Sequence, residues 1–411
     1  MTQPLITRSA PRYPVRRAEV IAAALRHLEE GDWARLEGTP ELERALEAFH
    51  GPSLTGAPPI AWFVTSGTAA LEAIMLGHEI GPGDEVITTP YTWAATVSSI
   101  LAIGAIPVFA DIHRDNGLLD PATVTACITK RTKAIMAVHL FGHPADCASL
   151  RRIADDHGLF LFEDGSQAHG ARRDGHLVGS WGDAAAFSCM GYKPLAGTEG
   201  GYALFRDPAR AEAAYLYGKH PRGLDPQRAK VLGEAGLLDA LQLGWRPCAV
   251  SAALIEAALP HLEEENAARR RNVARLRQDL EDCPALVLPP EDEGACGVYH
   301  LLSLIIDPEH CRRTPAEVVE RFNARGGQAF IYIPTPIHRL ARINPQDYQG
   351  PRCFWHDQLL RAGVDYRQIS CPRAEWRSAH SFEMGWNYTV DDPEAMPQIA
   401  AALKAAVEDL A

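Results

Sequence analysis

The stretch LFLFEDGSQAHG, residues 159–170, is a short apolar run that ends abruptly in two acidic residues. An apolar run of this length is typical of a strand that is buried on both faces, as the strands of parallel sheets are. Similar runs recur on either side of it and alternate with helical patterns, which predicts an α/β domain with a mostly parallel sheet sandwiched by helices. These runs, between residues 60 and 205, are IAWFVTS, EVITTP, IPVFADI, AIMAVHLFG, AAAFSC and GYALF.

Helical patterns flank this region. Two amphipathic segments precede it: RRAEVIAAALRHLEEGDWARL, with Gly31 as the predicted stop, and TPELERALEAFHG, with Thr39 as the predicted N-cap. After about residue 207 the chain reads as one or two long helices interrupted at GWRP, followed by a mixture of strands such as QAFIYIP and helices. We expect residues 1–255 to form N-terminal helices and a large domain, and residues 256–411 a smaller C-terminal α/β domain.

The composition limits the possible partners. The chain has 411 residues, a net charge of −12 and no basic block, so we expect neither nucleic acid nor a membrane surface as a partner. No apolar run reaches the roughly 18 residues needed to cross a bilayer, and the N-terminus lacks the apolar region of a signal peptide. The nine cysteines form no C-x-x-C pair, which indicates reduced thiols, no metal site and a cytoplasmic location.

The candidate site residues stand at the carboxyl ends of the predicted strands, because ligands of open parallel sheets bind there. Ser66, Gly67 and Thr68 lie where a strand turns into a helix, a place that suits a phosphate but equally a simple helix cap. Trp93 opens the helix after the next strand, where it can offer its face to a planar ring or anchor the core.

Two further strand ends carry ionisable groups. Asp164 ends the strand quoted above, with Gln167 and His169 beyond it, and a buried carboxylate there needs a cationic partner. A structural salt bridge or a helix cap meets that need as well as a ligand does, and we expect His169 to be structural rather than catalytic. Lys193 follows Ser188 on the AAAFSC strand, where a lysine is ordinarily a solvated surface residue.

Together these parts are the ones that pyridoxal 5'-phosphate requires. The cofactor needs a lysine amine for a Schiff base, an acid beside its pyridinium nitrogen, an aromatic surface and a phosphate cradle. In this interpretation Asp164 keeps the ring nitrogen protonated, and Lys193 first binds the aldehyde carbon and later carries a proton between substrate and cofactor. Each signal is ambiguous alone, but their order at consecutive strand ends favours this cofactor.

From about residue 15 to its C-terminus, the chain resembles the fold-type I aminotransferases of the DegT/DnrJ/EryC1/StrS family. The family pattern of a serine, a lysine and then G-E-G-G is seen as Ser188, Lys193 and GTEGG, and EDGSQAHG is similar to its E-D-x-x-Q-x-H-G block. TSGTAAL and PYTW match its phosphate and ring-stacking segments.

The resemblance implies a role for each candidate residue. Lys193 is the Schiff-base lysine, Asp164 the partner of the ring nitrogen, Gln167 a contact to the ring hydroxyl and Trp93 the stacking side chain. The resemblance also implies a homodimer with its active sites at the subunit interface. The residues that it implies for the phosphate are Gly67, Thr68 and Ser188.

The implied reaction moves an amino group from glutamine or glutamate to a keto-cyclitol or keto-sugar in antibiotic or secondary-metabolite biosynthesis. Within the family the chain looks most similar to the branch that acts on inososes, on the strength of AAFSC and the tail RAEWRSAHSFEMGWNYTV. Polar loop residues that we name as candidate contacts to the acceptor are Tyr91, Lys219, His220, Tyr332 and His338.

One departure from the family keeps alternatives open. The family usually has G-x-N-Y-R after the active-site loop, and its asparagine reaches the phosphate of the neighbouring subunit; LGWRPCAV has Gly244 in place of the asparagine, and Arg246 at the arginine. A different reaction on the same cofactor, namely dehydration, elimination or oxidation of a sugar or amino acid, is therefore the alternative hypothesis. A non-catalytic regulator or scaffold on this fold is a second alternative, against which the intact Lys193 and Asp164 argue.

Overall fold

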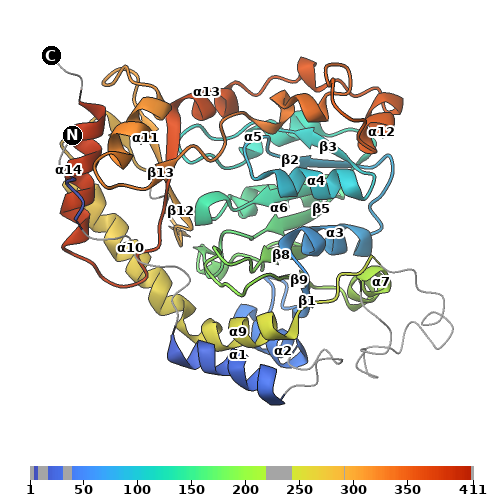
Figure 1. The fold of residues 1–411 in the computed structure, drawn as a ribbon. Coiled ribbons are helices and arrows are strands. Elements are labelled where there is room, and N and C mark those ends of the chain that lie inside the picture. The colour runs from blue at the N-terminus through green and yellow to red at the C-terminus, as the bar shows by residue number, and fades with distance from the viewer. Residues whose placement is uncertain (1–3, 8–16, 31–38, 219–242, 291, 409–411) are drawn as a thin grey trace.

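The computed structural model describes residues 4–7, 17–30, 39–218, 243–290 and 292–408. Its centre is a seven-stranded sheet in the order β1-β9-β8-β5-β4-β2-β3 (Figure 1). Strand β9 is antiparallel to both of its neighbours, and the remaining strands all run in one direction, as the sequence predicts for a mostly parallel sheet. The strands are β1 (Ile60–Val64), β2 (Glu85–Thr88), β3 (Ile106–Phe109), β4 (Thr132–Val138), β5 (Phe160–Asp164), β8 (Ala184–Ser188) and β9 (Gly201–Phe205).

Helices cover both faces of this sheet because its strands are apolar on both sides. Along β4, Ala134 and Met136 pack into the cluster formed with α3 and α7, while Ile135 and Ala137 pack into the cluster formed with α6. The helices around the large sheet are α1 (Ala18–Glu30), α2 (Thr39–His50), α3 (Gly67–Gly77), α4 (Ala94–Ala102), α5 (Pro121–Val124), α6 (Cys147–His157), α7 (Pro208–Gly218) and α9 (Ala249–Ala258).

A second, antiparallel sheet forms most of the C-terminal part, in the order β10-β12-β14-β13. Three helices pack with it around one apolar core (Figure 1). Its strands are β10 (Leu286–Val287), β12 (Leu301–Ile306), β13 (Ala329–Phe330) and β14 (Ser381–Gly385), and its helices are α10 (Leu262–Asp279), α11 (Pro315–Asn323) and α14 (Ala395–Val407). A small third sheet consists of β6 (Arg172–Arg173), β7 (His176–Leu177) and β11 (Ala295–Cys296).

Two expected elements differ from the structure. The predicted strand QAFIYIP is reduced to the two residues of β13, and the Tyr332 amide that follows it donates to a side chain instead of to the sheet. The long helical segment around GWRP has no regular structure over residues 243–248 and then continues as α9 and α10, which a turn at Leu259–His261 separates.

One segment of the C-terminal half leaves its own sheet and packs on the β3 edge of the large one. It contains α12 (Trp355–Arg361), which lies near β3 and α4 in Figure 1, and α13 (Pro372–His380), which lies between α11 and α5 there. Residues of this segment share an apolar cluster with α4 and β3. The chain then returns to the small sheet as β14. The remaining turns of 3-10 helix are η1 (Thr125–Cys127), η2 (Leu140–Gly142), η5 (Ile337–Arg339), η6 (Ala341–Ile343) and η7 (Tyr366–Gln368).

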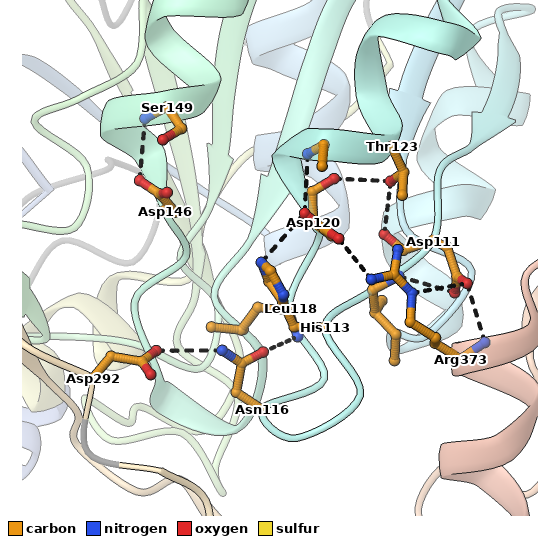
Figure 2. Close-up of polar contacts among 12 residues, drawn as sticks. Asp111, His113, Asn116, Leu118, Asp120, Thr123, Asp146, Ser149, Asp292 and Arg373 are labelled. Carbon is orange, nitrogen blue, oxygen red and sulfur yellow. Dashed lines mark hydrogen bonds and ion pairs between the residues drawn. The ribbon is translucent and has the colours of Figure 1, made fainter.

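A polar network fixes this segment to the large domain (Figure 2). The carboxylate of Asp111 accepts hydrogen bonds from the backbone amides of Arg373 and Ala374, both at 3.0 Å, and so caps the N-terminus of α13 from a remote part of the chain. The Arg373 guanidinium also donates to Asp120 at 2.7 Å. Residues 337–380 are therefore anchored to the large sheet although they follow the expected domain boundary at residue 255.

Among the described residues, no helix combines the length and the apolar character that a membrane span requires. All nine cysteines are free thiols.

Candidate active site

A cavity of about 890 Å³ lies at the carboxyl ends of the large sheet's parallel strands, between that sheet and the small one. Its wall includes every residue that the sequence assigns to the cofactor, and one of the candidate acceptor contacts. These residues are Ser66, Gly67, Thr68, Trp93, Asp164, Gln167, Ser188, Lys193 and Tyr332.

Lys193 lies in the turn after β8 and is buried, with 7 % of its surface exposed. Its backbone amide donates to the Met190 carbonyl at 2.8 Å, which fixes the turn. Burial lowers the pKa of its ammonium to about 8, although the nearby Asp164 and Cys189 act in the opposite direction. A large fraction of this amine is therefore neutral near pH 8, which is the form that attacks a carbonyl carbon.

Asp164 is the last residue of β5, and its carboxylate is held from two sides. The Thr96 hydroxyl, from α4, donates to Oδ2 at 2.7 Å, and the Ser166 amide donates to Oδ1 at 3.1 Å. Lys193 lies close enough to interact electrostatically with this carboxylate. Asp164 is thus a hydrogen-bond acceptor held in a fixed position at the cavity wall.

The first turn of α3 forms a close contact with the end of β8. The Ser66 hydroxyl caps the helix by accepting from the Ala69 amide at 3.1 Å. A Cβ atom at Gly67 would lie 2.6 Å from Cβ of Ser188, so only glycine lets the helix begin this close to the strand. The positive end of the helix dipole, together with the hydroxyls of Thr68 and Ser188, makes this corner suitable for a phosphate.

An aromatic pair forms another wall of the cavity. Trp93 is 53 % exposed and stacks on Tyr332, with ring centroids 5.3 Å apart and an angle of 25° between the ring planes. The Gln167 amide nitrogen donates to the Tyr332 hydroxyl at 3.2 Å, while its oxygen accepts from the Phe141 amide at 2.7 Å. Phe141 has the left-handed φ of 59°, a strained conformation that this hydrogen bond helps to hold.

Two of the candidate acceptor contacts do not line the cavity, and this is a correction to the sequence-based prediction. Tyr91 is fully buried, and its hydroxyl makes a 3.0 Å hydrogen bond with Ser381 of β14. His338 is also fully buried and pairs through Nε2 with Glu375 at 3.0 Å. Tyr91 joins the large domain to the C-terminal half, whereas His338 pairs within that half, and neither lines the cavity.

The other expected residues do not line the cavity or are not described by the structure. Lys219 and His220 lie outside the described residues. His169 is fully buried, and within the part of the chain that the structure describes neither of its ring nitrogens has a hydrogen-bond partner. Burial lowers its pKa well below the usual value, which leaves the ring neutral. Gly244 has a left-handed φ of 74° on an exposed stretch and is absent from the cavity wall.

The structure adds polar residues that the sequence reasoning missed. Thr96 was detectable, because it lies three residues after Trp93 on the same face of α4. Glu199 is the acidic residue of the GTEGG motif in the lysine loop, and Asn387 lies in the tail RAEWRSAHSFEMGWNYTV. His300 and Gln328 come from the small domain, and none of the quoted family motifs contains them.

A buried cluster that reaches the cavity wall through His139 contains His139, Cys147 and Glu163, three residue types that can bind a metal. Glu163 already accepts from the backbone amides of Gly179 and Gly182, at 2.8 and 2.7 Å, and lies 3.2 Å from His139 Nε2. Burial alone would raise the pKa of Glu163, but its interaction with His139 and the two backbone hydrogen bonds lower it below its usual value. We assign no metal to this cluster because its carboxylate is engaged by the fold.

The sequence matches one family of known proteins over most of its length. The family model of the DegT/DnrJ/EryC1/StrS aminotransferase family matches residues 15–361. The chain belongs to this family. The match covers the large domain, the lysine loop, and the segment that packs on β3 as far as the end of α12.

Several curated relatives are similar over much of their length. The erythromycin biosynthesis sensory transduction protein EryC1 of Saccharopolyspora erythraea is 39 % identical over 67 % of this chain and 71 % of its own. The dTDP-3-amino-3,4,6-trideoxy-alpha-D-glucose transaminase of Streptomyces venezuelae is 36 % identical over 79 % of this chain and 80 % of its own. The L-glutamine:2-deoxy-scyllo-inosose aminotransferase of Streptomyces kanamyceticus is 40 % identical over 53 % of this chain and 52 % of its own.

Among solved structures, that of S. venezuelae DesV in complex with a ketimine intermediate superimposes with a TM-score of 0.79. The two chains are 29 % identical, and the similarity covers 96 % of each. The predicted fold of a large α/β domain with a smaller C-terminal one is confirmed by this likeness.

Proposed function

We propose that this protein is a pyridoxal 5'-phosphate-dependent aminotransferase that moves an amino group from glutamine or glutamate to the ketone of a cyclitol or sugar. The observation that carries the proposal is the buried Lys193 amine, which shares one cavity with the fixed carboxylate of Asp164. Two of the relatives above are named as transaminases of an amino sugar and of an inosose, which supports this acceptor class.

The residues present fit the cofactor. Gly67 lets the α3 N-terminus pack directly against Ser188, which brings the positive end of the helix and the hydroxyls of Thr68 and Ser188 to one corner of the cavity, where they suit a phosphate. Trp93 is the half-exposed aromatic surface, Asp164 the acceptor for a protonated ring nitrogen, and Lys193 the amine for the aldehyde. When bound, the cofactor supplies an electron sink that weakens the bonds at the carbon bearing the amino group.

The protein's own groups then orient the substrates and move protons. In its free form the Lys193 amine, Nζ, takes a proton from the donor's α-carbon and delivers it to a carbon of the cofactor. The Asp164 carboxylate keeps its position throughout, because the Thr96 hydroxyl and the Ser166 amide donate to it. The donor leaves as a 2-oxo acid, and its amino group is passed to the ketone in the second half of the cycle.

The polar wall from the small domain is the proposed binding surface for the hydroxyl groups of the acceptor. His300, Gln328, Asn387 and Tyr332 line the cavity there. A polyol whose hydroxyl groups found no partners in such a site would be strongly disfavoured, so these side chains select a hydroxylated ring over an apolar one.

We further propose a homodimer in the cytoplasm. The free state of all nine cysteines suits a reducing compartment. Trp93 is half exposed at the cavity wall, which suits a site completed by a second subunit. The alternative reactions on the same cofactor rest on Gly244, whose counterpart in the family reaches the phosphate of the neighbouring subunit, and the half-reaction below distinguishes them from transamination. A purely regulatory role would leave the buried amine without a purpose.

The first experiment is a half-reaction. The holoenzyme is mixed with glutamine or glutamate, and both the visible absorbance band and 2-oxo acid release are measured. We expect the band to bleach as the 2-oxo acid appears. Lys193→Ala should lose the band, while Lys133→Ala, at an exposed lysine on β4, should keep it. If no amino donor bleaches the band of the wild-type protein, the protein is not an aminotransferase.

The second experiment defines the acceptor. The protein, once aminated by the donor, is offered inososes and nucleotide-linked keto-sugars, and the aminated product is identified by mass. Turnover with a hydroxylated cyclic ketone is the expected result. Turnover with simple 2-oxo acids alone would contradict the acceptor class while leaving the aminotransferase reaction in place.

A further inference from the structure

Glu383 is a buried acid on the strand of the small sheet that faces the large domain. Its side chain is 1 % exposed. On β14 the alternate residues Phe382 and Met384 point into the small domain's apolar core, so Glu383 and Ser381 point the other way. Ser381 meets the large domain directly, through its hydrogen bond with Tyr91.

The Glu383 carboxylate makes contacts that the sheet itself cannot make. Oε2 accepts from the Tyr332 backbone amide at 2.7 Å, just past the end of β13. Oε1 accepts from the hydroxyl of Ser303, the residue directly opposite on β12, at 3.0 Å. Glu383 thus continues the pairing of the edge strand where the backbone ladder stops.

The groups facing this carboxylate come from three further elements. The buried guanidinium of Arg377, on α13, donates to the Ser303 hydroxyl at 3.0 Å and attracts the carboxylate. The buried phenol of Tyr91 lies close enough for the charge on Glu383 to raise its pKa further, beyond the effect of burial. Burial and Asp164 raise the pKa of the Tyr332 hydroxyl, and Glu383 adds a smaller contribution in the same direction.

Tyr332 connects this network to the cavity. Its ring stacks on Trp93, and its hydroxyl accepts from Gln167, two of the residues proposed to contact the cofactor. The backbone position of Tyr332 therefore sets where both the aromatic surface and the Gln167 amide lie.

We propose that Glu383 is a positioning residue of the active site: by holding the Tyr332 backbone it fixes the Trp93–Tyr332 stack and the Gln167 amide in the geometry that binds the cofactor ring. The proposal rests on the proposed function only for the identity of that ring. Nothing in the motifs around Lys193 contains this residue, which lies 190 positions further along the chain.

The test compares Glu383→Ala with Glu383→Gln, because glutamine keeps an oxygen for the Tyr332 amide and alanine does not. The matched control is Glu320→Gln, the same change on the exposed face of α11. We expect Glu383→Ala to bind pyridoxal 5'-phosphate about 10- to 100-fold more weakly, the usual range for losing a charged acceptor of a buried donor. Glu383→Gln and the control should stay within about threefold of wild type.

Two measurements on the cofactor-free protein separate this proposal from the proposed function. The first is the emission of Trp93, taken as the difference between each protein and its Trp93→Phe counterpart. The second is hydrogen exchange of the Tyr332 amide. We expect Glu383→Ala to shift the emission and expose the amide, and Glu383→Gln to restore both.

The outcomes are decisive whatever reaction the enzyme performs. Equal cofactor affinity and equal Trp93 emission in wild type and Glu383→Ala would overturn the proposal, as would identical losses in the alanine and glutamine variants. If Glu383→Ala does not fold, Ser303→Ala replaces it, since it frees one carboxylate oxygen. That variant should alter Trp93 emission in the same direction, and an unchanged emission would count against the proposal.

Discussion

The effect of Glu383→Gln on the free energy of unfolding should be more favourable at pH 8 than at pH 5. Burial raises the pKa of Glu383 from 4.5 to about 7, more than its hydrogen bonds to Tyr332 and Ser303 lower it. The folded protein therefore keeps a proton that the unfolded chain releases between these two values. The stability that this group contributes is present below pH 4.5 and falls as the pH rises to about 7.

The size of the effect follows from the shift. A difference of roughly 2.5 pKa units corresponds to about 3 kcal/mol over the whole window, at about 1.4 kcal/mol per unit. Most of it, roughly 2.5 kcal/mol, falls between pH 5 and pH 8, because the unfolded carboxyl is already largely ionised at pH 5. Glutamine cannot ionise, so the free energy of unfolding of the variant lacks this fall between pH 5 and pH 8.

The assay is urea unfolding of the cofactor-free protein at pH 5, 6, 7 and 8, at one protein concentration, for wild type, Glu383→Gln and Glu320→Gln. The quantity of interest is the variant's free energy of unfolding minus that of wild type, plotted against pH. We expect it to rise with pH for Glu383→Gln and to stay flat for the control. A flat or falling curve for Glu383→Gln would refute the reasoning.

Three other changes have defined outcomes. Asp164→Asn should keep the fold but slow the half-reaction with glutamine by about 10²- to 10⁴-fold, because the amide cannot hold a protonated ring nitrogen by charge. Stopped-flow absorbance measures this rate, and an unchanged rate would contradict the role of Asp164. Gly67→Ala places a methyl group 2.6 Å from Ser188 Cβ and should weaken cofactor binding, at about 1–3 kcal/mol of strain, in an equilibrium titration; full affinity would contradict the close contact. Asp111→Ala removes the cap of α13 and should cost about 1–2 kcal/mol of unfolding free energy, whereas Asp115→Ala, at an exposed neighbour, should cost little; equal costs would contradict the capping.

The large sheet and the cofactor side of the site follow from local sequence. Apolar runs alternating with helical patterns predict the parallel strands, and residues that end parallel strands must gather at one edge of the sheet. This is why the sequence alone places Ser66, Trp93, Asp164 and Lys193 together. The family motifs add the same residues independently.

The acceptor side could not be predicted in this way. The sequence shows Tyr91 and His338 only as polar residues of predicted loops, and the direction of a loop side chain depends on contacts far along the chain, here with Ser381 and Glu375. The sequence does not indicate the role of Glu383 for a related reason: within SFEMG this residue has the pattern of a solvent-facing position on a half-exposed strand. Its burial arises only because the large domain covers that face.

The capping of α13 by Asp111 has a consequence for how substrates enter. The polypeptide leaves the small sheet after β13, is pinned against the β3 edge, and comes back as β14. A sheet that is tethered between two of its own strands is restrained from rotating away from the large domain as a rigid body. Weakening the tether should therefore change how readily a bulky ring enters the cavity.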